Sequence, residues 1–357
     1  MHASLAQKSI FDRPEIVALV TSAADQIYSI NKDSAYYYTE EVRKLLPDHP
    51  IVPMMEAVSV LWYNIPVLQD DVFDRFNDRL FATVKAAKQL PEGHLDAIFF
   101  EMSARGLLAE YYADRGAYMK AFNEATHAYS LLKQGFDYVE EYPEFLFTVG
   151  LYNYFREAYP ERHPIYKPLI WFFKSGDKVL GLEQLKRATK ETIMIRVEAY
   201  VYLSYIFLRY EEDPELSQKY ITELYEEFPT NPYVQAKFLE SYHADKKYSQ
   251  LHSEIIVRLK ADESAYYRLV GNLYGGVVDE YVAGNLNTAF KQYQDAARIS
   301  NQLPGYADHY KSLIHFGLGR IYHQEGKKKQ AGIEFQTALS YAQTKEVIEE
   351  VNRWMNP

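Results

Sequence analysis

Apolar residues recur along most of this chain at three- and four-residue intervals, the spacing of one face of an α-helix. Between Pro14 and Ile30, for example, they fall at positions 16, 17, 19, 20, 23, 24 and 27. Short breaks rich in Gly, Pro, Asn and Asp separate these stretches, and no segment keeps the alternation that is typical of a strand. The pattern predicts an all-α fold.

The breaks divide the helical stretches into antiparallel hairpins joined by short turns. The eight expected hairpins are Pro14–Leu45, Val52–Ala87, Leu95–Leu132, Glu144–Ala188, Ile193–Phe228, Tyr233–Leu259, Ala265–Asn301 and Tyr306–Ala342. The second and sixth have degenerate patterns. We therefore expect a leader at residues 1–13, an α-α superhelical solenoid of about eight hairpins at 14–345, and a capping helix at 346–357.

Three hairpins share one register, which identifies an internal repeat. Each has a turn glycine followed by residues at +5, +9 and +12: Gly116 by Ala121, Ala125 and Ala128; Gly284 by Ala289, Tyr293 and Ala296; Gly326 by Ala331, Phe335 and Ala338. The glycine is expected to end the first helix in a left-handed cap. The small residues at +5 and +12 then allow close helix packing, while the residue at +9 fills the gap.

This register resembles the tetratricopeptide repeat. In the last hairpin, Leu318, Gly319 and Tyr322 precede the turn at that family's spacing, and Leu108, Ala109 and Tyr112 do so in the third. Pro47, Pro229 and Pro232 resemble the family's closing prolines. The resemblance implies a scaffold fold, and it implies no particular activity because this repeat serves many functions.

The fourth hairpin is interrupted. Gly150 and Gly181 are 31 positions apart where an uninterrupted unit needs 12, so 19 residues are inserted. Residues 150–188 resemble a signature found in a bacterial subset of tetratricopeptide proteins, G-x-Y-N-Y followed by G-D-K-x-x-G-L-x-x-L. They also resemble a eukaryotic group linked to the mitochondrial outer membrane and to inclusion-body clearance.

The insert, Tyr159 to Ser175, contains three prolines and the apolar run 169–173. One interpretation buries its rings against the solenoid, because exposed patches of that size are rare. The other is a docking loop for a partner or a membrane surface. The candidate residues are Arg162, His163, Lys167, Trp171, Phe172, Lys174 and Asp177. Asp177 also fits the N-cap of the following helix.

The concave groove of such a solenoid is its usual ligand surface. The resemblance implies that first-helix residues face it, and the candidates are Glu110, Asp114, Glu198, Tyr205, Arg209, Asn272, Asp279, Phe316, Arg320 and His323. Their mixed charges would suit a peptide, or they would form a solvated face.

Composition excludes several classes of function. The net charge of -10 argues against nucleic-acid binding, and the absence of Cys removes disulfides and thiolate sites. His309, His315 and His323 are spaced by 6 and 8, which does not suit a metal site on one helix face. No nucleotide-binding, hydrolase or metalloprotease motif is present, so we expect no cofactor, no metal and no enzymatic activity.

The compartment is left open. Ala3-Ser4-Leu5-Ala6 before Gln7 resembles the end of a signal peptide, which would make the protein exported, whereas the chain as given has no apolar h-region and would be cytoplasmic. No apolar run is long enough to span a bilayer. The sequence therefore predicts a non-enzymatic scaffold that binds an unidentified protein or peptide in its groove. The alternatives are a small-ligand or enzymatic accessory protein with a pocket beside the insert, and a peripheral membrane protein.

Overall fold

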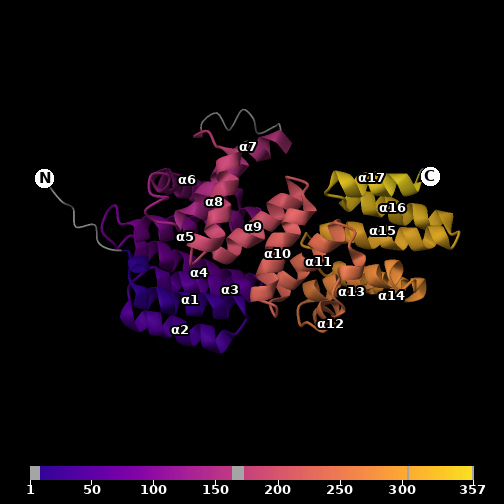
Figure 1. The fold of residues 1–357 in the computed structure, drawn as a ribbon, viewed down its shortest axis with the longest axis horizontal. Coiled ribbons are helices and arrows are strands. Elements are labelled where there is room, and N and C mark those ends of the chain that lie inside the picture. The colour runs from indigo at the N-terminus through magenta and orange to yellow at the C-terminus, as the bar shows by residue number, and fades with distance from the viewer. Residues whose placement is uncertain (1–8, 163–172, 304, 356–357) are drawn as a thin grey trace. The chain divides into compact units, whose positions relative to one another are not determined.

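The computed structural model describes residues 9–162, 173–303 and 305–355. Within these ranges the chain forms 17 α-helices and no strand, and neighbouring helices pack in antiparallel pairs (Figure 1). The expected all-α solenoid of helical hairpins is confirmed. Residues 1–8 of the expected leader 1–13 lie outside the described residues, and its last part contains a short 3₁₀ helix.

The chain divides into two compact units, Met1–Leu203 and Ser204–Pro357, here called unit 1 and unit 2. Unit 1 contains η1 (Ile10–Asp12), α1 (Pro14–Tyr28), α2 (Lys32–Leu45), α3 (Ile51–Trp62), α4 (Asp70–Ala87), α5 (Leu95–Asp114), α6 (Tyr118–Gly135), α7 (Phe145–Arg162) and α8 (Lys178–Glu191). Helix α9 (Arg196–Arg209) begins in unit 1 and ends in unit 2.

Unit 2 contains α10 (Pro214–Glu227), α11 (Pro232–Ala244), η4 (Tyr248–Gln250), α12 (Ser253–Lys260), α13 (Ala265–Tyr281), α14 (Leu286–Ser300), α15 (Asp308–Gln324), α16 (Lys328–Tyr341) and α17 (Lys345–Met355). The helices α9, α11, α13 and α15 are the first members of consecutive hairpins. Helix α17, at the position of the expected capping helix, begins at Lys345, one residue before the expected start at 346.

The turn glycines behave as the repeat register predicts. Gly116, Gly284 and Gly326 have φ values of 72°, 66° and 75°, the left-handed region that ends a helix without strain only in glycine. In the last two register hairpins all the residues at +5, +9 and +12 are buried.

The third hairpin departs from the register. Ala121 is buried as expected, but Ala125 at +9 is exposed, so its predicted gap-filling role is wrong. The preceding residue, Glu124, is buried instead and accepts a 2.5 Å hydrogen bond from Arg105 of α5. This ion pair places Glu124, one position before Ala125, against the first helix.

The fourth hairpin consists of α7 and α8, and most of the expected insert between them lies outside the described residues. A Cβ atom on Gly181 would lie 2.6 Å from the Tyr154 backbone nitrogen and 2.7 Å from the Gly150 carbonyl oxygen, so α7 and α8 approach closely there. Asn153 on α7 also donates a 2.8 Å hydrogen bond to Gln184 on α8. Helix α7 continues through Pro160 to Arg162, so the first residues of the expected insert, 159–162, extend this helix.

Candidate functional site

In unit 2 the terminal helix α17 packs against α15 and α16 and reaches the C-terminal ends of the first helices α11 and α15. First helices of consecutive hairpins run in the same direction, so these ends share one edge of the unit. Glu350 of α17 pairs with Lys246, just after α11, at 3.0 Å. Trp354 of α17 packs edge-on against His323 near the end of α15, with ring centroids 5.5 Å apart. We call the surface formed by Lys246, Phe316, His323 and Phe335 the α17 seat.

The apolar part of the seat comes from α15 and α16. Val351 is fully buried, and it is the one buried side chain of α17. It packs in a cluster with Phe316 of α15 and Phe335 of α16, and Val347, Trp354 and Met355 of α17 are partly buried against the same cluster. Burial of a side chain such as Val351 stabilises the contact by roughly 1.5–3 kcal/mol.

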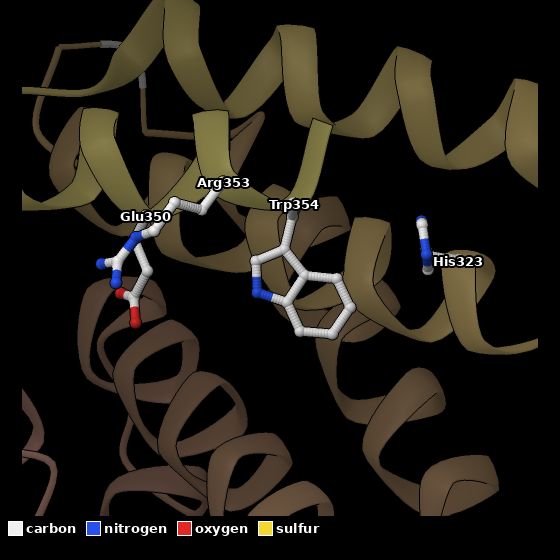
Figure 2. Close-up of a pocket in the computed structure, with 4 residues that line it drawn as sticks. All are labelled: His323, Glu350, Arg353 and Trp354. Atoms are coloured by element: carbon white, nitrogen blue, oxygen red, sulfur yellow. The ribbon is translucent and has the colours of Figure 1, made fainter. Parts of the chain in front are cut away.

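A cavity of about 310 Å³ lies beside these contacts, lined by His323, Glu350, Arg353 and Trp354. Figure 2 shows Glu350, Arg353 and Trp354 on α17, with the indole ring directed toward His323 on the neighbouring helix. The groove candidate His323 therefore borders a cavity, and α17 forms the rest of its described lining.

Arg320, another groove candidate, lies one turn before His323 in a buried ion pair. Its Nε and Nη2 atoms each donate a 2.8 Å hydrogen bond to the Glu280 carboxylate on α13, and both side chains are buried. The guanidinium also lies 4.2 Å from the centre of the Phe316 ring. Burial alone would lower the pKa of Arg320, but the Glu280 carboxylate outweighs it and raises that pKa above its ordinary value. Arg320 thus joins α13 to α15.

Arg209, at the end of α9, is also engaged within unit 2. It donates to the Glu240 carboxylate on α11 and, at 2.9 Å, to Nε2 of His309 on α15. Lys237 donates a second charge-assisted hydrogen bond to Glu240 at 2.8 Å. Burial would raise the pKa of Glu240, but Lys237 and Arg209 hold it well below its usual range. Burial lowers the pKa of His309 to about 3, so its imidazole is neutral at pH 7.

In unit 1 two groove candidates remain exposed. Glu110 and Asp114 lie one turn apart on α5, and neither has a hydrogen bond or ion pair with another described residue. Burial raises the pKa of Glu110 to about 7, and the neighbouring Asp114 raises it further in the same direction. The side chain of Glu110 is exposed, and nearby protein atoms still restrict the hydration of its carboxyl group.

Glu198 of α9 has a different environment, because it binds two other helices of unit 1. It accepts hydrogen bonds from the Tyr28 hydroxyl at 2.9 Å and from Nε1 of Trp62 at 3.0 Å. Nearby, Glu144 accepts hydrogen bonds from two backbone N–H groups, those of Ile193 at 2.6 Å and of Met194 at 3.3 Å. Burial raises the pKa of Glu198, and it raises the pKa of Glu144 to about 8. Glu198 therefore ties α1 and α3 to α9.

The remaining groove candidates do not converge with these. Tyr205 is exposed, and its ring lies 5.9 Å from that of Tyr210. Asn272 donates at 2.8 Å to a carbonyl of its own helix, that of Arg268. Asp279 accepts a hydrogen bond from Gln292 of α14, so it faces its own hairpin partner.

The insert candidates are only partly visible: His163, Lys167, Trp171 and Phe172 lie outside the described residues. Arg162 is the last residue of α7. Lys174 lies 3.8 Å from the Phe136 ring centre, where its charge meets the ring face. Asp177 is the N-cap of α8, since its carboxylate accepts 3.0 Å hydrogen bonds from the N–H groups of Val179 and Leu180.

One buried cluster in unit 1 has the composition of a catalytic triad without its geometry. The Ser9 hydroxyl donates directly to the Asp96 carboxylate at 2.6 Å, and Nε2 of His49 lies 3.4 Å from the same carboxylate. A nucleophilic serine needs the imidazole between itself and the carboxylate. Here Asp96 is the centre, and Tyr142 also donates to it at 2.9 Å. The cluster attaches the first described residues to α5.

Sequence reasoning missed Lys237, Glu240 and Glu280. Each lies on a first helix, but the sixth hairpin, which holds Lys237 and Glu240, has no clear register from which to assign a face. Glu280 immediately follows the candidate Asp279 in the sequence. Consecutive residues are about 100° apart around a helix, so an error of one position in assigning the buried face is enough to miss it.

Within the described ranges, no three His, Asp or Glu side chains are grouped in a way that would hold a metal ion. No helix of the described chain is long and apolar enough to cross a membrane. A scan against models of known protein families finds no match, and a search of curated proteins finds no relative.

Proposed function

We propose that this chain is a non-enzymatic protein-binding scaffold of the tetratricopeptide-repeat type, which takes up a helical or extended segment of a partner along the first helices of its hairpins. The observation that carries this proposal is that α17, an amphipathic helix, packs on α15 and α16 in unit 2 and reaches Lys246, just after α11. A surface with an apolar patch and a basic side chain at its edge suits a helix.

The exposed carboxylates of unit 1 support the same function. Glu110 and Asp114 occupy the first helix of a hairpin whose turn fits the repeat register, and the pKa of Glu110 is raised by burial. A basic side chain from a partner would favour the ionised form of Glu110 and gain a charge-assisted hydrogen bond. We therefore infer that the unit 1 surface prefers a basic segment.

The test of this function needs side chains that contribute little to folding. Charge reversal of Glu198, Arg209 or Arg320 would break buried hydrogen bonds and destabilise the protein. The loss of a partner could then result from unfolding and not from a lost binding contact. Glu110 and Asp114 are exposed, and their reversal to Lys leaves those networks intact.

The experiment is affinity capture from the native organism with quantitative mass spectrometry. It compares the wild type with the double variant Glu110→Lys/Asp114→Lys, and with the control variant Glu226→Lys on the exposed side of α10. The proposal predicts partners that the wild type and the control retain and the double variant loses. Identical partner sets for all three proteins would contradict a role for the unit 1 surface.

A further inference from the structure

Most of the apolar contacts that hold α17 on its seat are only partly buried. Val351 is its one buried side chain, and Val347, Trp354 and Met355 are partly buried against the same cluster. Its ion pair, Lys246 with Glu350, is half-exposed on the lysine side, and such pairs contribute little to stability. By contrast, the buried pair between Arg320 and Glu280 joins α13 to α15 without any residue of α17. This link between α13 and α15 would therefore persist when α17 leaves its seat.

The side chains of α17 indicate which kind of helix its seat can bind. Glu346 and Glu350 lie one helical turn apart, and the positive charges that act on the Glu346 carboxyl include Lys246 and Arg209. Val351 and Trp354 follow at five and eight positions after Glu346 and fill the apolar patch. The seat thus matches a helix with two acids one turn apart, then an aliphatic residue and an aromatic residue.

We propose that α17 is a resident occupant of this seat, which a partner helix with the same acidic and apolar pattern displaces. This inference rests on the proposed scaffold function and names one class of partner for unit 2. Release of α17 would expose the Phe316 and Phe335 patch, the His323 ring and the ammonium of Lys246. These are the groups that an acidic amphipathic helix would contact.

The expected strength of this competition follows from tethering. A short link such as residues 342–344 gives α17 an effective concentration on the order of 1 mM at its seat. If the same helix binds as a separate peptide with a Kd of about 10 μM, α17 occupies the seat about 100 times more often than it leaves it. A competing helix then binds the intact chain about 100-fold more weakly than it binds a chain with α17 displaced.

The test uses the full chain and a fluorescein-labelled peptide of residues 345–355, measured by fluorescence polarisation. Val351→Asp and Trp354→Ala each weaken the hold of α17, and Ile348→Asp, on a more exposed part of the same helix, is the matched control. A peptide carrying Val351→Asp and Trp354→Ala controls for unspecific binding. Hydrogen exchange of α13 and α15 checks that the seat remains folded.

We expect the peptide to bind Val351→Asp and Trp354→Ala about 100-fold more tightly than it binds the wild type and Ile348→Asp. Adding Lys246→Glu to Val351→Asp should weaken that binding by about three- to tenfold, because the reversed charge repels Glu350 in place of pairing with it. Equal binding to all chains, or none while α15 stays protected, would overturn the inference. A concentration-dependent dimer of Val351→Asp with no peptide binding would also overturn it, since the occupant would then be a second copy. The scaffold function would survive either result if Glu110→Lys/Asp114→Lys still loses its partner.

Discussion

Replacing Arg320 by Met tests whether this residue stabilises unit 2 or contacts a partner. The sequence suggests a groove residue, but the guanidinium makes two 2.8 Å hydrogen bonds to Glu280 inside unit 2. Met has a similar length and no charge, so the substitution removes the ion pair with little change in packed volume. Glu280 would remain buried, with Tyr293 still donating to it at 2.7 Å.

The expected cost is large because a buried carboxylate loses its counter-charge. Removing one partner of a buried ion pair destabilises a protein by about 3–5 kcal/mol. The hydrogen bond from Tyr293 to Glu280 is worth about 1.5–3 kcal/mol, but it is present in the wild type as well. It therefore gives the variant no new compensation for the lost ion pair. For a unit of this size, the loss corresponds to a decrease in Tm of about 6–20 °C.

The assay is urea unfolding followed by hydrogen exchange of α13 and α15, which reports on unit 2 alone. Arg298→Met is the matched control, because its ion pair with Asp295 is exposed and should contribute less than about 1 kcal/mol. If Arg320→Met lowered the free energy of unfolding by no more than the control does, the structural role of Arg320 would be refuted and its place among the binding candidates restored.

Three further substitutions test other parts of the structure. Gly181→Ala should destabilise unit 1 because its Cβ meets backbone atoms of α7, whereas Gly106→Ala, with open space at its Cβ, should stabilise by about 0.5–1 kcal/mol in thermal unfolding. Glu144→Gln should flatten the pH dependence of unit 1 stability: burial raises the folded-state pKa of Glu144 to about 8, above its usual value of 4.5, so the wild type loses stability as the pH rises from about 4.5 to 8. A variant that keeps the full slope would contradict this assignment. Tyr274→Phe should leave the Tm unchanged or raise it, because that buried hydroxyl has no hydrogen-bond partner among the described residues, whereas Tyr293→Phe, which loses a bond to Glu280, should lower it.

The hairpins could be predicted because their signals are local. Helical periodicity and a turn glycine lie within one repeat unit, and the left-handed conformations of Gly284 and Gly326 follow from the residue itself. The N-cap role of Asp177 is local in the same sense. The +9 position in the third hairpin failed because the buried pair of Arg105 and Glu124 depends on both helices at once.

The burial and the hydrogen-bond partners of the candidate residues could not be predicted from the sequence, because those partners come from other hairpins. Arg320 pairs with Glu280, 40 positions away, and Glu198 binds Tyr28, 170 positions away. A helical pattern gives the face on which a charge lies but not the charge that meets it. The position of α17 likewise depends on how successive hairpins bring the ends of α11 and α15 together.

Hydrogen exchange along α15 and α17 in the full chain tests most directly whether unit 2 carries a helix-binding seat with an exchangeable occupant. If α17 is a tethered occupant, its amides should have protection factors of about 100. The α15 amides, which open only with the unit, should reach on the order of 10,000 or more. Addition of the 345–355 peptide in large excess should lower the protection of α17 and leave that of α15 unchanged. Equal protection of the two helices, unaffected by the peptide, would contradict the existence of an exchangeable seat.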